Sequence, residues 1–478
     1  MIAELGAVPP VAEATPPAAG AIASILPALR TMLGERLSTG NSVREQHGRG
    51  EGVPDLFPPD AVTFPESNEE VAAIARLCSA HRVPIVPFGA GTSLEGHVTA
   101  LRGGLSVDLS RMDRVLDVSP EALDCRVQAG MTRLRLNAEL RSHGLFFPID
   151  PGADASIGGM AATRASGTAA VRYGTMRENV LGLTVVTPDG RIVRIGSRAR
   201  KSSTGLDLTR LYVGSEGTLG LITEVQLRLH GLPEAVSAAV CQFPDVRLAL
   251  DATISILQAG IPMARIEFVN ALQMRMCIRY SKLEGLAEQP TLFLEFQGSP
   301  AAVAEQVELV QALCEEAGGN GFLWANRPEE RSRLWKARHD TYYANLHYLP
   351  GRSQMGTDAC VPISALAECI LETEADVAAT GLLAPLVGHV GDGNFHLGIL
   401  FDPTSPEERA RADGLARRTG ERAIRLGGTC SGEHGIGMHK LDLAAEEHGE
   451  ALSLMWAVKN ALDPLGIMNP GKLLKPLN

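Results

Sequence analysis

The sequence lacks the paired cysteines, long apolar runs and basic clusters that mark several large classes of protein. Its eight cysteines form no Cys-x-x-Cys pair, so the chain shows no disulfide framework, haem attachment motif or iron–sulfur pattern, and we expect free thiols. No apolar stretch approaches the roughly 20 residues of a membrane-spanning helix. The formal net charge is −11 without any lysine or arginine block, so we expect no nucleic-acid partner.

The N-terminus also lacks targeting features. It begins MIAELGAVPP, without the basic start of a secretory signal or the arginine-rich character of a transit peptide. We therefore expect a cytoplasmic protein, with room for a peripheral contact with an inner membrane.

Length and changes of pattern divide the chain. The 478 residues are too many for one ordinary core and predict two or three domains. Residues 1–54 predict a helical arm, and 55–233 predict an α/β domain of short strands and glycine-rich loops. Residues 234–440 predict an α+β domain, and 441–478 a segment that folds back on the first domain.

Three glycine-rich segments stand out in the first domain: 87–96, 150–174 and 214–224. The first follows a predicted strand, and its glycines would let backbone N–H groups approach an anion such as a pyrophosphate. Leu94 stands where the dinucleotide fingerprint GxGxxG needs its third glycine, and no P-loop lysine is present. One such loop is no more than a turn, but three favour a bound nucleotide cofactor.

The second domain contains two histidines seven residues apart in GHVGDGNFHLG. If Asp392-Gly393 forms a type I′ turn, His389 and His396 pair directly across two strands, with Cβ atoms about 4.5–5.5 Å apart. A longer loop would break that register. Glu433 and His434 lie in GGTCSGEHGIG, where apolar context is nearly absent. His389, His396 and Glu433 would form a three-ligand metal site with open positions, although each alone could be a hydrogen-bonded loop residue.

A predicted helix, RSRLWKARHDTYYANLH, places Trp335, Arg338 and Tyr342 on one face. An arginine held between aromatic rings suits a bidentate grip on a carboxylate. The alternative is a surface arginine whose stem packs on Trp335.

The segments PFGAGTSLEG, DPGADASIGGMAAT, VRYGTMRENVLGL and VGSEGTLGLITE, in this order, resemble the flavin-binding domain of the vanillyl-alcohol oxidase / p-cresol methylhydroxylase superfamily. The resemblance implies an α+β fold, with a two-subdomain FAD-binding domain and a C-terminal substrate (cap) domain built on an antiparallel sheet. It implies FAD bound noncovalently, because the matching segments contain no histidine; His97 is the nearest one, and we expect it to be exposed. The implied cofactor-binding residues are Pro87, Gly89, Ala90, Gly91, Thr92, Ser93, Gly96, Pro151, Gly152, Ala153, Ser156, Ile157, Gly158, Gly159, Thr163, Gly167, Val171, Gly217, Ile222 and Asn469.

Further motifs narrow the resemblance. VREQHGRGE, WKARHD, GHVGDGNFH, TDACVPIS, GGTCSGEHGIG and LDPLGIMNPGK run through residues 42–478. They resemble the cytochrome-linked, FAD-dependent D-lactate dehydrogenases, in the type 4 family of FAD-binding oxidases and transferases. That resemblance implies a divalent metal, zinc or manganese, on His389, His396 and Glu433. It also implies that His434 is the catalytic base and that Arg338 binds the substrate carboxylate.

The resemblance implies oxidation of a D-2-hydroxy acid to a 2-oxo acid. The metal would lower the pKa of the substrate hydroxyl, His434 would remove its proton, and a hydride would pass to flavin N5. The electrons would go to an external acceptor such as a cytochrome c, a quinone or another electron carrier, and the assembly could be a homodimer. Glycolate or D-2-hydroxyglutarate dehydrogenase and a noncatalytic flavin subunit are the alternatives; the Glu433-His434 pair argues against the last.

Overall fold

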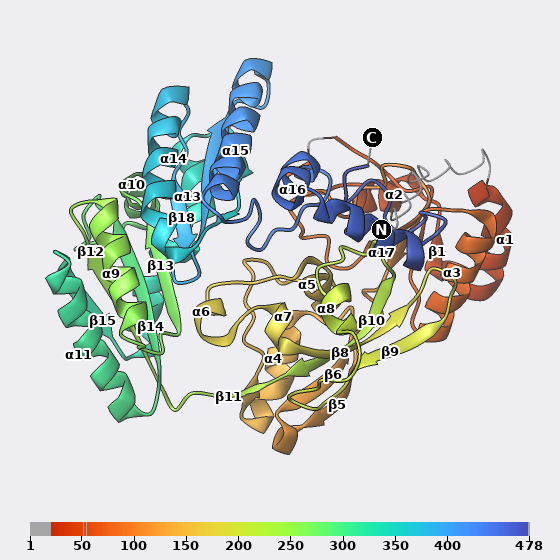
Figure 1. Ribbon diagram of the computed structural model, residues 1–478, viewed down its shortest axis with the longest axis horizontal. Coiled ribbons are helices and arrows are strands. Elements are labelled where there is room, and N and C mark those ends of the chain that lie inside the picture. The colour runs from red at the N-terminus through yellow and green to blue at the C-terminus, as the bar shows by residue number, and fades with distance from the viewer. Residues whose placement is uncertain (1–20, 51, 54, 477–478) are drawn as a thin grey trace, which may run out of the picture.

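The computed structural model describes residues 21–50, 52–53 and 55–476 (Figure 1). The first twenty residues of the predicted N-terminal arm lie outside this part. The rest of the arm starts with helix α1 (Ala21–Leu33), whose buried residues Ile25, Leu29 and Leu33 pack on helix α3 (Asn68–His81). Figure 1 shows two lobes: the first contains β1–β11 and the second contains β12–β19.

The first lobe begins with a small sheet that carries the first glycine-rich loop. Its strands, in the order β1-β2-β4-β3, are β1 (Leu37–Ser38), β2 (Ala61–Thr63), β4 (Leu105–Asp108) and β3 (Ile85–Phe88). Strands β2, β4 and β3 are parallel, and α3 connects β2 to β3. Helix α3 begins at Asn68, because the Ser67 hydroxyl accepts a hydrogen bond from Glu70 N at 3.2 Å. The glycine-rich loop leaves the carboxyl end of β3, the end at which open α/β sheets bind ligands.

The second sheet of this lobe is antiparallel throughout, in the order β5-β6-β10-β8-β9. Asp189 and Gly190 lie in the hairpin loop that joins β8 to β9, where Val186 pairs with Ile192. The segment 150–174 contains two short helices, and Ser156 caps the first by accepting a hydrogen bond from Gly159 N. The bounds are β5 (Val115–Ser119), β6 (Asp124–Gln128), β8 (Val180–Val186), β9 (Ile192–Gly196), β10 (Leu221–Arg228), α4 (Arg133–Leu140), α5 (Ile157–Thr163), α6 (Ala170–Tyr173), α7 (Met176–Asn179) and α8 (Leu208–Tyr212). Strands β7 (Leu145–Phe146) and β11 (His230–Gly231) form a separate pair.

The second lobe is one large antiparallel sheet in the order β15-β12-β14-β13-β18-β19-β16, with β17 also paired to β19. The strands are β12 (Ala235–Gln242), β13 (Arg265–Val269), β14 (Thr291–Gly298), β15 (Asn320–Ala325), β16 (Ser353–Gly356), β17 (Ala359–Cys360), β18 (Leu386–His389) and β19 (Asn394–Phe401). Helices α9 (Val246–Gln258), α11 (Pro300–Glu316), α14 (Leu366–Thr380) and α15 (Pro406–Arg425) pack on one face. Helices α10 (Ala271–Ser281), α12 (Pro328–His339) and α13 (Thr341–Tyr348) pack on the other.

Side chains alternate between the two faces of this sheet, so that one face packs in the core and the other carries the candidate site residues. In β13, Ile266 and Phe268 are buried among the helices of the first face, whereas Arg265 and Glu267 point to the face that carries α12. His389 and His396 lie on that same face.

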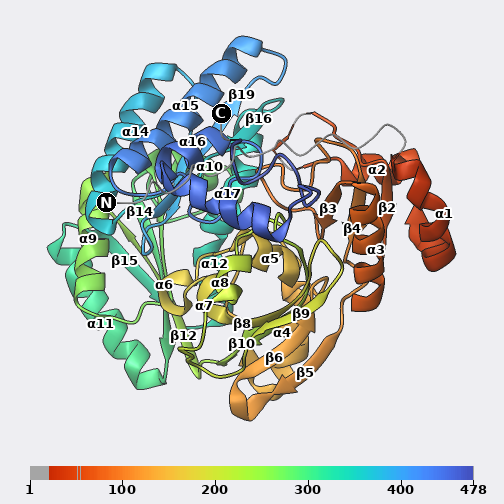
Figure 2. The same ribbon diagram turned by 45° about the vertical axis from the view of Figure 1, so that its right-hand side comes forward.

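The C-terminal segment returns to the first lobe, where helices α16 (Leu441–His448) and α17 (Ala451–Leu462) lie beside it (Figure 2). Lys459 Nζ on α17 donates to Thr218 O at 2.6 Å, and Asn469 N donates to Ile85 O in β3 at 2.8 Å. Within the described ranges, no helix combines the length and apolarity needed to span a membrane.

Candidate active site

A cavity of about 1330 Å³ lies between the two lobes and brings most of the predicted site residues together. The three glycine-rich segments form most of its wall in the first lobe, and Asn469 of the C-terminal segment adds to it. The predicted cofactor-binding residues on this wall are Pro87, Gly89, Ala90, Gly91, Thr92, Ser93, Pro151, Gly152, Ala153, Ser156, Gly158, Gly159, Thr163, Gly167, Gly217, Ile222 and Asn469. The second lobe and the loop after α15 contribute Arg338, His389, His396, Glu433 and His434 to the same cavity.

Three of the predicted cofactor-binding residues do not line the cavity. Ile157 is completely buried in the core of the first lobe, because it begins α5 with its side chain directed inward. Gly96 packs against Met438, and Val171 packs against Gly391. These residues support the wall or its contacts and do not form its surface.

The cavity wall fits a polar cofactor such as FAD. Ser93 Oγ and Asn469 Oδ1 are buried, line the cavity and have no hydrogen-bond partner among the residues that the structure describes. A buried hydroxyl or amide oxygen without a partner is costly, so such atoms indicate a ligand that completes them. Backbone and small side chains surround them, which leaves room for a large flat group.

The two histidines lie on one face, but not in the register predicted from Asp392-Gly393. His389 pairs with Asn394 and His396 pairs with Val387, so the loop between the strands is Val390–Gly393 and contains two more residues than the predicted turn. A shift of two residues preserves the face of each side chain, because side chains in a strand alternate with a period of two. The rings are therefore diagonal neighbours, with centroids 5.3 Å apart.

His389, His396 and Glu433 converge as a potential metal site. Glu433 Oε1 lies 3.2 Å from His389 Nε2 and 3.3 Å from His396 Nε2. On the far side of each ring, Nδ1 has its own hydrogen-bond partner. For His389 the partner is Glu267 Oε1 at 2.7 Å, and for His396 it is Thr357 O at 2.9 Å. Such outer contacts fix the tautomer and aim Nε2 at a metal, so these residues fit a divalent cation. Two imidazole nitrogens and one carboxylate oxygen suit both zinc and manganese.

The electrostatics of this cluster also favour a cation. Burial alone would lower the pKa of His389, but Glu267 and Glu433 outweigh burial and hold that pKa well above its usual range. Burial raises the pKa of Glu433, whereas His389 and His396 lower it further than burial raises it. The carboxylates thus stay ionised and stabilise positive charge between the rings.

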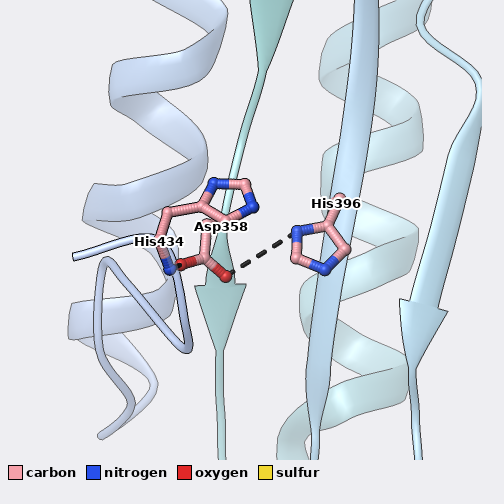
Figure 3. A group of neighbouring side chains, drawn as sticks. All are labelled: Asp358, His396 and His434. Carbon is pink, nitrogen blue, oxygen red and sulfur yellow. Dashed lines mark hydrogen bonds and ion pairs between the residues drawn. The ribbon is translucent and has the colours of Figure 1, made fainter. Parts of the chain in front are cut away.

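Asp358, His396 and His434 form a second close group, shown in Figure 3. Asp358 is not a good metal ligand, because its oxygens are already occupied. Oδ2 accepts hydrogen bonds from Ser431 Oγ at 2.7 Å, Glu433 N at 2.9 Å and His434 N at 2.8 Å, and Oδ1 accepts from Asn394 Nδ2 at 2.8 Å. Asp358 therefore holds the loop that carries Glu433 and His434.

His434 lies beside the potential metal site and can exchange a proton. Its ring stacks on that of His396, with centroids 5.1 Å apart and planes inclined by 13°. Its Nδ1 is 3.6 Å from Glu95 Oε1 and has no hydrogen-bond partner in the described part of the chain. Burial lowers the pKa of His434, but Asp358 and Glu95 reverse this and raise the pKa above its usual value.

Arg338 lies on the cavity wall, but not between aromatic rings as predicted. Helix α12 ends at His339 and α13 begins at Thr341, so Tyr342 does not share a helix with Arg338. The ring of Trp335 instead packs against Arg265, whose Cζ is 5.4 Å from the ring centroid. Arg338 donates through Nε to Glu267 Oε2 at 2.8 Å, and its two terminal nitrogens form no hydrogen bond with described residues. Those nitrogens can bind a carboxylate.

His97 is buried, not exposed as expected. The loop around Gly435 covers its ring. Its Nε2 lies 3.2 Å from Glu216 Oε2. The sequence reasoning also missed Glu267, Asp358 and Glu216 as parts of the site. For Glu267 a signal existed, since this acid stands in the apolar strand sequence RIEFV; Asp358 and Glu216 carry no comparable local signal.

The fold and the site together define a two-domain, flavin-dependent oxidoreductase. The family described as FAD linked oxidases, C-terminal domain, matches residues 232–473, and the family described as FAD binding domain matches residues 59–196. The chain belongs to the FAD-linked oxidase family.

The sequence is similar to several curated proteins along most of its length. It is 51% identical to "Probable D-lactate dehydrogenase, mitochondrial" of Danio rerio, over 95% of this chain and 92% of that one. It is 46% identical to "D-lactate dehydrogenase [cytochrome], mitochondrial" of Arabidopsis thaliana, over 94% and 79%. The glycolate oxidase subunit GlcD of Escherichia coli K12 is 34% identical, over 88% and 84%.

Solved structures share the fold. p-Cresol methylhydroxylase superposes with a TM-score of 0.79 at 17% identity, over 95% of this chain and 96% of that one. The predicted α+β fold, with a flavin-binding domain and an antiparallel cap sheet, is therefore confirmed. The cytoplasmic location predicted from the N-terminus is contradicted, because the relatives of Danio rerio, Arabidopsis thaliana and Saccharomyces cerevisiae are named mitochondrial proteins. The absence of arginine-rich and secretory patterns was an insufficient basis for that prediction.

Proposed function

We propose that this protein oxidises D-lactate, or a closely related D-2-hydroxy acid, to the 2-oxo acid and delivers the electrons to an external acceptor. One observation carries the proposal: Arg338, His434 and the His389–His396–Glu433 cluster lie on one wall of the cavity whose other wall is the FAD-binding loops. The 51% identity to a protein named as a D-lactate dehydrogenase, over nearly all of both chains, supports the choice of substrate.

The residues have separate roles in this proposal. Arg338 binds the substrate carboxylate through its two terminal nitrogens, in the bidentate geometry that suits a guanidinium. This contact orients the substrate so that C2 faces the cofactor and the hydroxyl faces the histidines. His434 accepts the hydroxyl proton at Nε2, since Nδ1 faces Glu95. Glu95 and Asp358 then stabilise the imidazolium.

Two bound groups would add chemistry that the side chains lack. FAD, held by the glycine-rich loops, would supply an acceptor for the hydride from C2. A zinc or manganese ion, held by His389, His396 and Glu433, would supply a Lewis acid for the substrate hydroxyl. The chain shows no Cys-x-x-Cys-His haem motif, so we propose a separate cytochrome c, quinone or other electron carrier as the acceptor. A homodimer is a further prediction, which light scattering can check.

Flavin reduction without oxygen tests the function. The FAD-loaded protein is mixed separately with D-lactate, L-lactate, glycolate and D-2-hydroxyglutarate, and the loss of flavin absorbance is followed. We expect fast bleaching with D-lactate. Faster bleaching with glycolate would favour a glycolate dehydrogenase. The 34% identity to GlcD supports that alternative less strongly than the 51% identity supports D-lactate oxidation. Bleaching with L-lactate alone would refute the stereochemistry, and no bleaching at all would refute the enzyme assignment.

A further inference from the structure

Glu267 is a fully buried acid in the middle of strand β13, and the strand register places it beside the histidine pair. Phe268 pairs with Gly388 and Val269 with Val387, so Glu267 stands next to His389 across the ladder. Its neighbours along the strand, Ile266 and Phe268, face the opposite side and pack in the core. A carboxylate in such a position needs partners, because burial of an unpaired charge is very unfavourable.

Each oxygen of Glu267 binds one functional residue. Oε1 lies 2.7 Å from His389 Nδ1, and Oε2 lies 2.8 Å from Arg338 Nε. Arg338 can only donate, and His389 Nδ1 must donate if Nε2 is to bind a metal. Both oxygens must therefore act as acceptors at the same time, which only a carboxylate can do.

Three elements meet at this carboxylate. Glu267 comes from β13, His389 from β18 and Arg338 from α12, and α12 is additionally packed on β13 through Trp335 and Arg265. Within the described residues, Glu267 is the hydrogen-bonded link between the proposed carboxylate-binding arginine and the proposed metal ligand. A change at Arg338 or at His389 therefore alters the position of Glu267 and, through it, the orientation of the other residue.

We propose that Glu267 is a positioning residue that couples substrate-carboxylate binding by Arg338 to metal binding by His389. This inference rests on the proposed function and adds a residue that touches neither substrate nor metal. Removal of the Arg338 side chain leaves the buried Glu267 carboxylate with one hydrogen-bond partner, so its hydrogen bond to His389 Nδ1 is no longer held in position. Loss of the carboxylate frees both the arginine and the imidazole from their orientation.

The decisive variant is Glu267→Gln, which keeps the shape but offers only one acceptor oxygen. Zn²⁺ affinity is measured on the FAD-loaded, full-length protein by competition with a chromogenic chelator, without substrate. We expect the Zn²⁺ dissociation constant to rise about 10–100-fold, the usual effect of losing an outer-shell partner. At saturating Zn²⁺ the KM for D-lactate stays raised, because Arg338 remains unrestrained, whereas FAD content is unchanged.

Glu374→Gln is the matched control. Glu374 lies on α14, accepts a hydrogen bond from Asn270 Nδ2 at 2.9 Å and does not line the cavity. The same chemical change there should leave the Zn²⁺ affinity and the KM for D-lactate unaltered.

Arg338→Met tests the coupling from its other end, and it decides the matter should Glu267→Gln fail to fold. We expect it to weaken Zn²⁺ binding at least about fivefold, the lower range of coupling between sites. In the Glu267→Gln background the same change should have little further effect. If either Glu267→Gln or Arg338→Met binds Zn²⁺ with wild-type affinity, the proposed coupling is overturned, but the proposed metal site is not. Absence of Zn²⁺ binding by the unmodified protein would overturn the proposed metal site and the coupling with it, whereas anaerobic flavin reduction reports on the oxidation separately.

Discussion

The substitution Gly435→Ala tests whether the position of His434 depends on close packing of its loop. Gly435 has a φ of +85°, and a Cβ there would lie 2.7 Å from Glu216 Oε1 and 2.8 Å from His97 Nε2. Glu216 Oε1 also accepts a hydrogen bond from Ile436 N at 2.7 Å. The methyl group therefore meets a buried carboxylate and a buried ring that have little room to move.

The cost follows from two contributions. A left-handed backbone costs an L-residue about 1–2 kcal/mol. Breaking the charge-assisted hydrogen bond between Ile436 N and Glu216 costs about 1.5–3 kcal/mol. The sum, about 2.5–5 kcal/mol, exceeds what the native loop can absorb without moving. We expect the loop to shift and His434 to lose its alignment, so the rate of flavin reduction should fall by about 10²–10⁴-fold, the usual contribution of a general base.

Anaerobic stopped-flow measurement of flavin reduction by D-lactate reads this out, with FAD content as a check on integrity. Gly427→Ala is the matched control, since Gly427 has a φ of +77° but nothing within 4 Å of the added Cβ. It should lose about 1–2 kcal/mol of stability from backbone strain and keep its rate. Equal rates in the two variants would refute the argument from packing.

Three further outcomes are expected. His389→Ala should lose the metal and turnover but retain FAD, and unchanged metal content by elemental analysis would contradict the ligand assignment. Asp150→Asn should weaken FAD binding about tenfold by fluorescence titration, because Asp150 pairs with Arg265 at 3.0 Å and accepts from Thr168 Oγ1 beside the flavin loops. Burial lowers the pKa of Lys472 to about 7 although Glu216 opposes it. Because the unfolded lysine titrates near ~10.4, the stability that depends on neutral Lys472 grows from pH 7 to 10 and is lost as the pH falls through 7. Lys472→Met should therefore flatten the rise in melting temperature over that window, and an unchanged slope would show that Lys472 is not responsible.

The regular elements of the cap could be predicted because their signals are local. Strand β13 (Arg265–Val269) and helix α11 (Pro300–Glu316) both carry such local signals. Apolar periodicity and the Ser299 cap define such elements within one stretch of chain. The break between α12 and α13 escaped prediction, since neither glycine nor proline marks Asp340.

The site was less predictable, because it depends on register and on distant contacts. His389 and His396 share a face as expected, although the hairpin is two residues out of the predicted register. Parity explains this result: any even shift keeps both rings on one side of the sheet. The acids behind the rings were not foreseen, because Glu267 is 122 residues from His389 along the chain and sequence spacing says nothing about such a pair.

The loop that carries Glu433 and His434 shows why neither lobe could form this site alone. Asp358 of the second lobe accepts hydrogen bonds from Glu433 N and His434 N, at 2.9 and 2.8 Å. Glu216 of the first lobe accepts hydrogen bonds from two further backbone N–H groups of this loop, Ile436 N at 2.7 Å and Gly437 N at 2.9 Å. The loop is thus attached to a buried carboxylate from each side of the cavity. Its position follows the separation of the two lobes, so any change that moves one lobe against the other moves His434 relative to both the histidine cluster and the glycine-rich loops.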